Sequence, residues 1–195
     1  ANYWMHNGFV NIDNVKMSKS LGNFITVHDA LKTIDGQVLR FFFATQHYRK
    51  PINFTEKAVR DAETNLKYLK NTYEQPFTGE VDPADLQGFV DKFIATMDED
   101  INAANGITVV FELAKWINSG HYNQDVKDVL TKMLEVFGVV FVEEVLDADI
   151  EALIAERQEA RAKKDFARAD AIRDELAAQG IKLLDTKEGV RWTRD

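Results

Sequence analysis

The segment 55–149 repeats apolar residues at helical spacing, and this feature restricts the possible folds more than any other. Its clearest helix start is Asp82-Pro83, because an aspartate cap followed by proline suits the first helical turn. The apolar positions after it fall three and four residues apart, at Leu86, Phe89, Val90, Phe93, Ile94 and Met97. Such a helix has one apolar face, which must pack against other elements to leave water.

Three more stretches of this segment follow the same rule. Thr55 is predicted to cap a helix that ends before Pro76, a further helix is predicted around 109–117, and a last helix follows the break at Ser119-Gly120. The apolar stripes of the first and last are Val59, Ala62, Leu66, Leu69 and Tyr73, and then Val126, Val129, Leu130, Met133, Leu134 and Phe137. Four amphipathic helices with short connections predict an antiparallel bundle over residues 55–146.

Charge is unevenly distributed along the chain, whose formal net charge is −8. Residues 61–150 hold 18 Asp and Glu against 6 Lys and Arg, whereas residues 1–60 hold 4 against 8. We therefore expect local cationic contacts rather than tight non-specific binding of nucleic acid. The acidic run Asp98-Glu99-Asp100 is interpreted as a solvated helix end and not as a metal or catalytic cluster, because no histidine lies near it in sequence.

The chain contains no cysteine, which excludes disulfides and thiolate metal sites and is compatible with a cytosolic protein. No signal peptide is visible, and no apolar run is long enough to span a bilayer. Because the sequence begins with Ala1 inside what reads as a folded segment, we expect it to be part of a longer protein. These observations predict a cytoplasmic protein without membrane contact.

A cationic loop is predicted at Lys16-Met17-Ser18-Lys19-Ser20, because the following Leu21-Gly22-Asn23 and the serines favour turns. Lysine ammonium groups, hydroxyls and backbone N–H groups are the donors that bind polyphosphate. The alternative is an ordinary solvated turn. The residues alone leave both interpretations open.

The loop is flanked by short predicted elements. Residues 5–12 are predicted to form a short buried strand that leads into it. Thr26 and Asp35 are predicted to cap two helices, and the second of these is apolar nearly all round and should be buried. Arg40 lies in that apolar helix, and we favour a paired core arginine over one that faces a substrate or a nucleic acid.

The last segment, residues 147–195, differs from the bundle. Caps at 147–149 precede a helix from Ile150 to about Lys163, and a second helix ends at Gly180. Two β-prone runs follow, separated by a predicted turn over 185–189. The expected fold class is thus mainly α: a tail with the lysine loop, a helical bundle, and a small C-terminal α/β module with a hairpin.

Lys16-Met17-Ser18-Lys19-Ser20 is, letter for letter, the second signature (KMSKS) of the class I aminoacyl-tRNA synthetases. The residues around it and far from it resemble cysteinyl-tRNA synthetase, and the resemblance extends to the end of the chain. It rests on Tyr3–Val10, Arg40–Phe42, His47–Arg49, Pro51–Phe54, Lys164–Phe166, Ala169-Asp170, Ile172-Arg173, Gly180-Ile181, Asp185-Thr186, Gly189 and Trp192. The chain therefore resembles the C-terminal part of such an enzyme, without the N-terminal half of its catalytic domain.

The resemblance implies a role for each part of the chain. Residues 1–54 would be the end of the catalytic domain with its stem-contact helices, 55–146 a DALR-type anticodon-binding bundle, and 147–195 the anticodon-recognition module. The whole enzyme would activate cysteine with ATP and Mg and transfer it to tRNA(Cys), as a cysteine–tRNA ligase. Lys16 and Lys19 would be catalytic, by neutralising charge on the β- and γ-phosphates. The ATP-binding set implied is Lys16, Met17, Ser18, Lys19 and Ser20.

In the C-terminal module the resemblance implies tRNA contacts, which suit aromatic, Arg and Asp side chains because unstacked bases offer π faces and amino groups. The implied residues are Arg161, Phe166, Asp170, Asp185 and Trp192. Each has a structural alternative. Arg161 and Asp170 could pair across two helices, Asp185 could form a turn, and the two aromatic residues could be core.

The resemblance also implies what this chain lacks. The family's other ATP-binding signature, of His-Ile-Gly-His type, and its zinc ligands would lie upstream, so no metal site is expected here and the chain alone should be inactive. We expect a monomer. The alternatives are a mycothiol-type cysteine ligase, another class I synthetase such as the methionyl enzyme, and a non-catalytic tRNA-binding or scaffold protein. An intact lysine loop counts against the last of these, and residues 150–195 count against the first.

Overall fold

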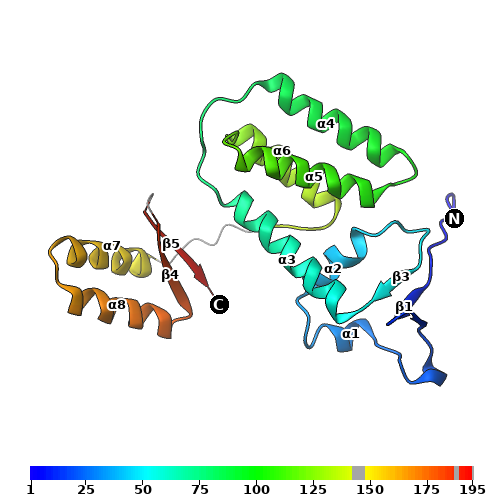
Figure 1. Ribbon diagram of the computed structural model, residues 1–195, viewed down its shortest axis with the longest axis horizontal. Helices are drawn as coiled ribbons and strands as arrows, with labels where there is room; N and C mark the ends of the chain where they lie inside the picture. The colour runs from blue at the N-terminus through cyan, green and yellow to red at the C-terminus, as the bar shows by residue number, and fades with distance from the viewer. Residues whose placement is uncertain (142–147, 187–188, 195) are drawn as a thin grey trace. The chain divides into compact units, whose positions relative to one another are not determined.

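The structure is a computed structural model that describes residues 1–141, 148–186 and 189–194. The chain folds into two compact units, Ala1–Phe141 and Val142–Asp195. Helices dominate both units, which confirms the expected mainly α fold class (Figure 1). None of the helices in the described ranges combines the length and the hydropathy that crossing a bilayer would need.

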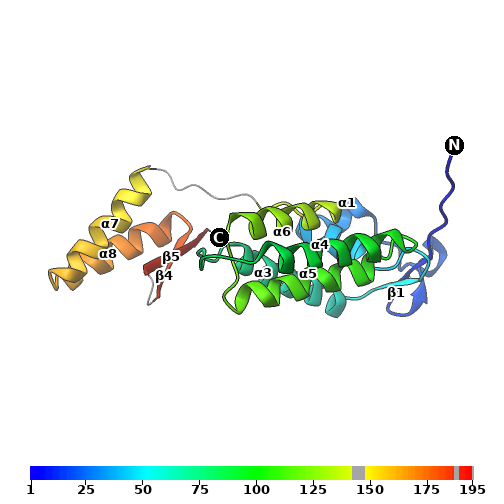
Figure 2. The ribbon, with the colours of Figure 1, turned by 90° about the horizontal axis from the view of Figure 1, so that it is seen from above.

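Four helices form the bundle of the first unit: α3 (Glu56–Tyr73), α4 (Pro83–Asp98), α5 (Ala103–Asn118) and α6 (Gln124–Val136). Figures 1 and 2 show consecutive helices running in opposite directions, as predicted. Each helix begins at a capping side chain that accepts a backbone N–H hydrogen bond, and these caps are Thr55, Asp82, Asn102 and Asn123. Helix α5 starts earlier than the predicted 109, because the Asn102 cap satisfies its first turn.

The core of this unit centres on α5, which contributes Val110, Leu113 and Ile117, all without solvent exposure. Leu69 of α3 and Leu130 of α6 are equally buried against it. Burying each such side chain contributes about 1.5–3 kcal/mol. The apolar stripe predicted for α4 is wider than the face that the helix buries. Leu86 and Phe93 are buried, whereas Ile94 is 51% exposed.

A three-stranded sheet precedes the bundle, with strand order β2-β1-β3. Strands β1 (Val10–Ile12) and β2 (Val15–Lys16) are antiparallel and are joined by a two-residue turn with positive φ at Asp13 and Asn14. Strand β3 (Ile52–Phe54) pairs in parallel with β1, so that Val10 lies opposite Ile52. The sheet thus brings together segments about 40 residues apart in sequence.

The predicted buried strand over 5–12 is wrong in extent and in burial. Only residues 10–12 are in the strand, they are half-buried, and Met5 is 58% exposed. The reason is that β3 offers only three residues for pairing. Before the strand, the N–H of Gly8 donates to the carbonyl of Tyr48 at 2.7 Å. Gly8 is required at this approach, because a Cβ there would lie 2.3 Å from the carbonyl oxygen of Lys50.

Two helices connect the loop to β3, namely α1 (Val27–Ala30) and α2 (Gly36–Ala44). Their predicted caps are confirmed, since Thr26 accepts from the N–H of Asp29 and Asp35 accepts from those of Gln37 and Val38. Helix α2 buries Val38, Leu39, Phe41 and Phe42.

Arg40 in α2 is exposed, so its interpretation as a core arginine is wrong. Its side chain lies beside Gly138, where a Cβ would come within 2.7 Å of the Arg40 Cδ. A long side chain with an aliphatic stem can cover apolar surface while its guanidinium stays in water, which is why an arginine fits an otherwise apolar helix.

The second unit contains α7 (Ala148–Ala162), α8 (Phe166–Ala178), β4 (Ile181–Thr186) and β5 (Gly189–Arg194). Two helices and a hairpin were predicted, and this is confirmed. Asp165 caps α8, and Gly180 ends it with φ 78°. The small core consists of Ile150, Ile172, Leu176 and Ile181.

The predicted turn over 185–189 is too long, because Asp185 pairs with Val190 and Thr186 with Gly189 in the β4–β5 ladder. Residues 185, 186 and 189, which the sequence assigns to the turn, therefore belong to the paired strands. The predicted caps at 147–149 fall partly on residue 147, which lies outside the described residues; Asp149 lies in the first turn of α7.

Candidate functional site

The Lys16–Ser20 loop begins at the last residue of β2 and continues into a short 3-10 turn, η1 (Lys19–Leu21), which Gly22 ends with φ 70°. Asn23 fastens the base of the loop. Its Oδ1 accepts from the N–H of Ser18 at 2.9 Å, and its Nδ2 donates to the carbonyl of Lys16 at 3.3 Å. The N–H of Met17 also donates to Val10 of β1 at 3.3 Å. The loop is thus held in place by hydrogen bonds to Asn23 and to strand β1.

Both lysines of the loop are exposed and lie over aromatic rings. The Lys16 Nζ is 4.9 Å from the ring centroid of Phe9, and the Lys19 Nζ is 5.4 Å from that of Phe24. Within the described part of the chain, neither ammonium group pairs with a carboxylate. An incoming anion therefore meets two cations whose charge is not already neutralised, since a cation–π contact leaves the positive charge in place.

The remaining loop residues divide by chemistry. The hydroxyls of Ser18 and Ser20 share a hydrogen bond of 2.7 Å, so the two side chains lie on one side of the loop. Met17 lines a small apolar pocket of about 40 Å³, between the sheet and helices α1 and α2. Its side chain anchors the loop to the fold, and its predicted contact with ATP stays a prediction.

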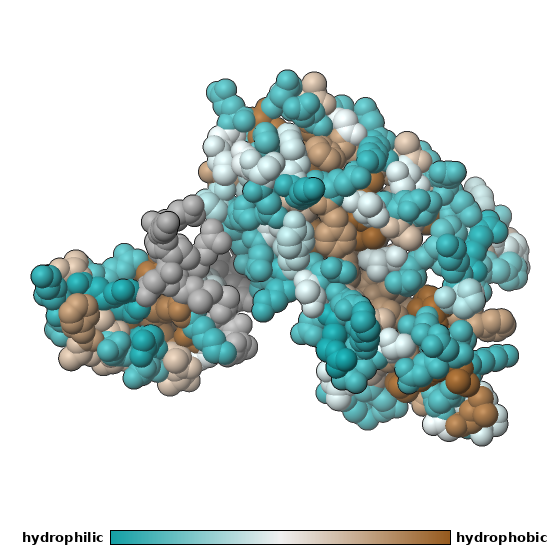
Figure 3. Space-filling view, viewed as in Figure 1, coloured by the Kyte–Doolittle hydropathy of each residue, from teal (hydrophilic) through white to brown (hydrophobic). Residues whose placement is uncertain are grey.

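Apolar side chains are exposed around the loop. Figure 3 shows them near β1 and α1, at the end of the unit that carries the loop. They comprise Phe9, Leu21, Phe24, Val27 and Leu31, which are between 46% and 66% exposed. So many exposed apolar side chains close to a polar loop are a feature of surfaces that bind a partner or a ligand.

The predicted RNA-binding residues of the second unit lie in three places. Phe166 and Asp170 are one helical turn apart on α8, and Phe166 is 62% exposed. Arg161 is exposed near the end of α7. The structure thus places an aromatic ring and a carboxylate on one face of α8, with the core alternative for Phe166 excluded by its exposure.

The other predicted RNA-binding residues lie in the hairpin. Trp192 of β5 is opposite Leu183 of β4 and packs against the small core, so it supports the module. Asp185 lies within β4 opposite Val190, and its side chain is outside what the structure describes. The turn-forming alternative for Asp185 does not fit its place in the strand.

Arg168 of α8 and Glu156 of α7 form an ion pair between the two helices of this unit, with 2.8 Å between Nε and Oε1. This hydrogen bond lowers the pKa of Glu156 and raises the pKa of Arg168. Asp170 instead lies 3.6 Å from Arg173 on its own helix. The structural alternative given above for Arg161 and Asp170 is an ion pair across these two helices. The cross-helix ion pair described here joins two other residues, Arg168 and Glu156.

A polar cluster that the sequence did not indicate lies where the α2–β3 loop meets the α4–α5 turn. The Asp100 carboxylate accepts hydrogen bonds from Arg49 Nε at 2.7 Å, Arg49 Nη2 at 2.9 Å and Tyr48 Oη at 2.6 Å. The bonds from Arg49 and then Tyr48 lower the pKa of Asp100 to about 2, and the same contacts raise the pKa of Arg49. The expectation that this acidic run is solvated holds only in part, because Asp100 is paired.

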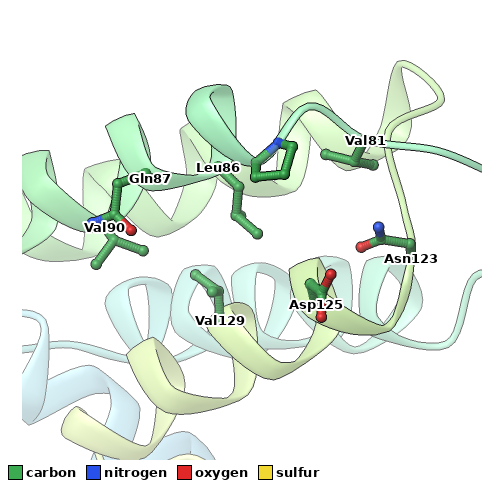
Figure 4. A pocket seen from close by; sticks show the side chains of 8 residues that line it. Val81, Leu86, Gln87, Val90, Asn123, Asp125 and Val129 are labelled. Atoms are coloured by element: carbon green, nitrogen blue, oxygen red, sulfur yellow. The ribbon is translucent and has the colours of Figure 1, made fainter.

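A pocket of about 210 Å³ lies between α4 and α6 (Figure 4). Its walls are largely apolar, with Val81, Leu86 and Val129 pointing into it. Its polar residues serve the helices: the Asn123 side chain caps α6, and Gln87 donates to Asp91 within α4. The remaining polar residue of the lining is Asp125, in the first turn of α6.

No group of three or more His, Asp or Glu side chains within the described ranges is arranged to hold a metal ion. The chain also has no cysteine to serve as a thiolate ligand. The described residues therefore do not fit the zinc site that the resemblance implies for the whole enzyme.

Three family models match successive parts of the chain. Residues 1–64 match the class I (C) tRNA synthetase catalytic domain, residues 92–143 the DALR domain, and residues 143–192 the cysteinyl-tRNA ligase anticodon binding domain. The cysteine–tRNA ligases of Streptococcus pneumoniae, Streptococcus mutans and Streptococcus thermophilus are 83%, 80% and 74% identical to the chain over all its 195 residues. The chain spans 44% of the length of each of these relatives.

Proposed function

The chain belongs to the cysteinyl-tRNA synthetase family, and we propose that it supplies the phosphate-binding loop and the tRNA-binding part of a cysteine–tRNA ligase. The observation that carries this proposal is the Lys16–Ser20 loop, fastened by Asn23 and presenting two lysines that no carboxylate of the described residues neutralises. The reaction would be ATP-dependent activation of cysteine, followed by transfer of the cysteinyl group to tRNA(Cys).

Activation joins the cysteine carboxylate to the α-phosphorus of ATP and releases pyrophosphate, so negative charge grows on the departing β- and γ-phosphates. Lys16 and Lys19 would approach that charge from the loop. A contact that strengthens as the charge develops lowers the barrier and does not merely tighten ground-state binding. Ser18 and Ser20 would donate hydrogen bonds to phosphate or keep the loop in shape.

The C-terminal unit would bind the anticodon of tRNA(Cys). Exposed Phe166 offers a ring for stacking, Asp170 one turn away offers an acceptor for base amino groups, and Arg161 offers a cation. Asp185 and Trp192 complete the proposed set, Trp192 as a supporting aromatic. The division into domains 1–54, 55–146 and 147–195 is part of the same proposal.

The cofactors belong to the whole enzyme. Mg would accompany ATP, and zinc would bind the cysteine thiolate through ligands outside this chain, because the residues here do not fit that site. We further propose that the enzyme is a cytoplasmic monomer. The 195-residue chain alone should show no cysteine-dependent ATP–pyrophosphate exchange.

The test of the loop uses the full-length enzyme that contains this sequence. Lys19→Ala should lower cysteine-dependent ATP–pyrophosphate exchange by about 100-fold, since it removes a charge that acts on the transition state. Lys50→Ala is the matched control, an exposed lysine in the same segment, and should stay within about twofold of wild type. Unchanged exchange in Lys19→Ala would contradict the proposal.

The test of the anticodon module compares Asp170→Asn with Asp174→Asn. Both aspartates are exposed on α8, and both lie near Arg173, at 3.6 and 3.7 Å. Only Asp170→Asn should lower kcat/KM for tRNA(Cys), by about tenfold, with pyrophosphate exchange unchanged. Equal effects of the two substitutions would show that the change is one of charge alone.

The alternatives are less well supported. A mycothiol-type cysteine ligase would not need residues 143–192, which match an anticodon binding domain. Another class I synthetase would not explain the match of the distal sequence. A non-catalytic tRNA-binding or scaffold protein would not need two lysines that, among the described residues, pair with no carboxylate in a loop fastened by Asn23.

A further inference from the structure

Asp100 connects two parts of the first unit that are distant in sequence. It lies in the turn between α4 and α5, and its three hydrogen bonds reach Tyr48 and Arg49 in the loop between α2 and β3. Arg49 binds with both Nε and Nη2, so the guanidinium and carboxylate planes have a fixed relative orientation. The contact therefore fixes direction as well as distance.

The backbone of this turn has an uncommon conformation. Asp100 has φ 59° and the next residue, Ile101, has φ 52°, both in the left-handed region. A β-branched residue is strongly disfavoured there, and burial does not compensate for it, because Ile101 is 51% exposed. Such an outlier indicates a constraint that the surroundings impose, and here the Asp100 contacts are that constraint.

The partners of Asp100 also hold the sheet that bears the lysine loop. The carbonyl of Tyr48 accepts from the N–H of Gly8 at 2.7 Å, and the N–H of Ile52 donates to Phe9 at 2.8 Å. Strand β1 follows directly and pairs with β2, whose last residue is Lys16. A continuous series of hydrogen-bonded segments thus leads from Asp100 to the loop.

The cluster contributes little to the core. The side chains of Arg49 and Asp100 are 64% and 43% exposed, and exposed ion pairs add little to stability. The neighbouring apolar core of α2 and α5 is buried without them. A specific, two-pronged contact on a strained turn, in an exposed position where it adds little to stability, points to a role in geometry.

We propose that Asp100 is a positioning residue that fixes the Lys16–Ser20 loop relative to the helical bundle through Tyr48 and Arg49. This inference rests on the proposed function. Activation of cysteine at the loop involves only small substrates, whereas charging requires the bundle to hold tRNA while its 3′ end reaches the loop. Loss of the Asp100 contact should therefore impair charging and leave activation intact.

The experiment measures both steps in the full-length enzyme carrying Asp100→Asn. Its kcat/KM for tRNA(Cys) in charging should fall about tenfold, while pyrophosphate exchange stays within about twofold of wild type. Asp98→Asn is the matched control, because it removes the same charge two residues earlier in a residue without a side-chain partner among the described residues, and it should change neither step. Tyr48→Phe removes one hydrogen bond and should lower charging about threefold.

A double variant distinguishes coupling from separate effects. Arg49→Ala with Asp100→Ala should charge no more slowly than either single variant, because each already breaks the same contact. Charging by Asp100→Asn and Tyr48→Phe at the wild-type rate would overturn the inference, and so would an equal loss of exchange and charging. Neither result touches the proposed function of the lysine loop, which fails if Lys19→Ala retains exchange.

Discussion

The helical bundle and the Lys16–Ser20 loop belong to one compact unit but are stabilised in opposite ways. The bundle depends on buried apolar side chains such as Leu113, which has no solvent exposure. The loop depends on hydrogen bonds from Asn23 and leaves both lysines in water. Stability and chemistry therefore depend on different residues, so a substitution in one region should affect stability or chemistry but not both.

The largest effect is expected for Leu113→Ala in the bundle. It leaves a cavity among fully buried neighbours, and we expect the free energy of unfolding to fall by about 2–5 kcal/mol. Urea denaturation of the 195-residue chain measures this. Val136→Ala on the exposed face of α6 is the control and should change it by less than about 0.5 kcal/mol. Equal losses would contradict the assigned core.

The converse substitution is Asn23→Ala in the loop. Because it removes both hydrogen bonds that fasten the loop, we expect pyrophosphate exchange by the full-length enzyme to fall about tenfold, equivalent to about 1.4 kcal/mol. The free energy of unfolding should change by less than about 0.5 kcal/mol. Asn71→Ala, on the exposed side of α3, is the matched control. A large fall in the free energy of unfolding would contradict the separation between the residues that stabilise the bundle and those that hold the loop.

Helix caps extend the comparison to smaller energies. Thr55 caps the 18-residue helix α3, whereas Thr26 caps the four-residue helix α1 beside the loop. Thr55→Ala should lower the free energy of unfolding by about 1 kcal/mol, and Thr26→Ala by less, because a short helix contributes little to the cooperative core. Thermal unfolding of both variants measures the difference. A larger effect of Thr26→Ala would be evidence that the loop region is part of the stabilising core.

The smallest effect concerns pH. The pKa of Asp100 is about 2 in the folded protein, below its ordinary value of 3.8, so its contribution to stability is present above about pH 4 and is lost as the pH falls towards 2. The urea midpoint of the wild-type protein should therefore be higher than that of Asp100→Asn at pH 6. This difference should shrink as the pH falls from 4 to 2. A difference that stays constant with pH would show that the carboxylate charge is not its cause.

Features that depend on local sequence could be predicted, and those that depend on distant partners could not. The helices follow from spacing and from caps such as Thr55 and Asp82, which act within one turn. The predicted bounds of the first strand were wrong, because the length of this strand depends on its pairing with the distant residues Ile52–Phe54. The turn at 185–189 failed in the same way, since cross-strand pairing extended both strands.

The candidate site divides similarly. The residues of the lysine loop were evident because they are contiguous, whereas the Asn23 fastening required knowing how the turn closes. An Asn three residues after the last serine of the loop is a sequence signal for such a side-chain-to-backbone bond. No sequence signal joins Asp100 to Arg49, because they are 51 residues apart and only the packing of the bundle brings them together.

The parallel pairing of β1 with β3 has a consequence for the order of folding. The bundle helices form from contacts between neighbours in sequence, whereas Val10 must find Ile52 across a segment that includes α1 and α2. Closing so long a connection is entropically costly until α2 has docked on α3, so the sheet should form late. The lysine loop, attached to that sheet, would then take shape after most of its unit, so a chain still emerging from the ribosome would hold a formed bundle before it held a formed loop.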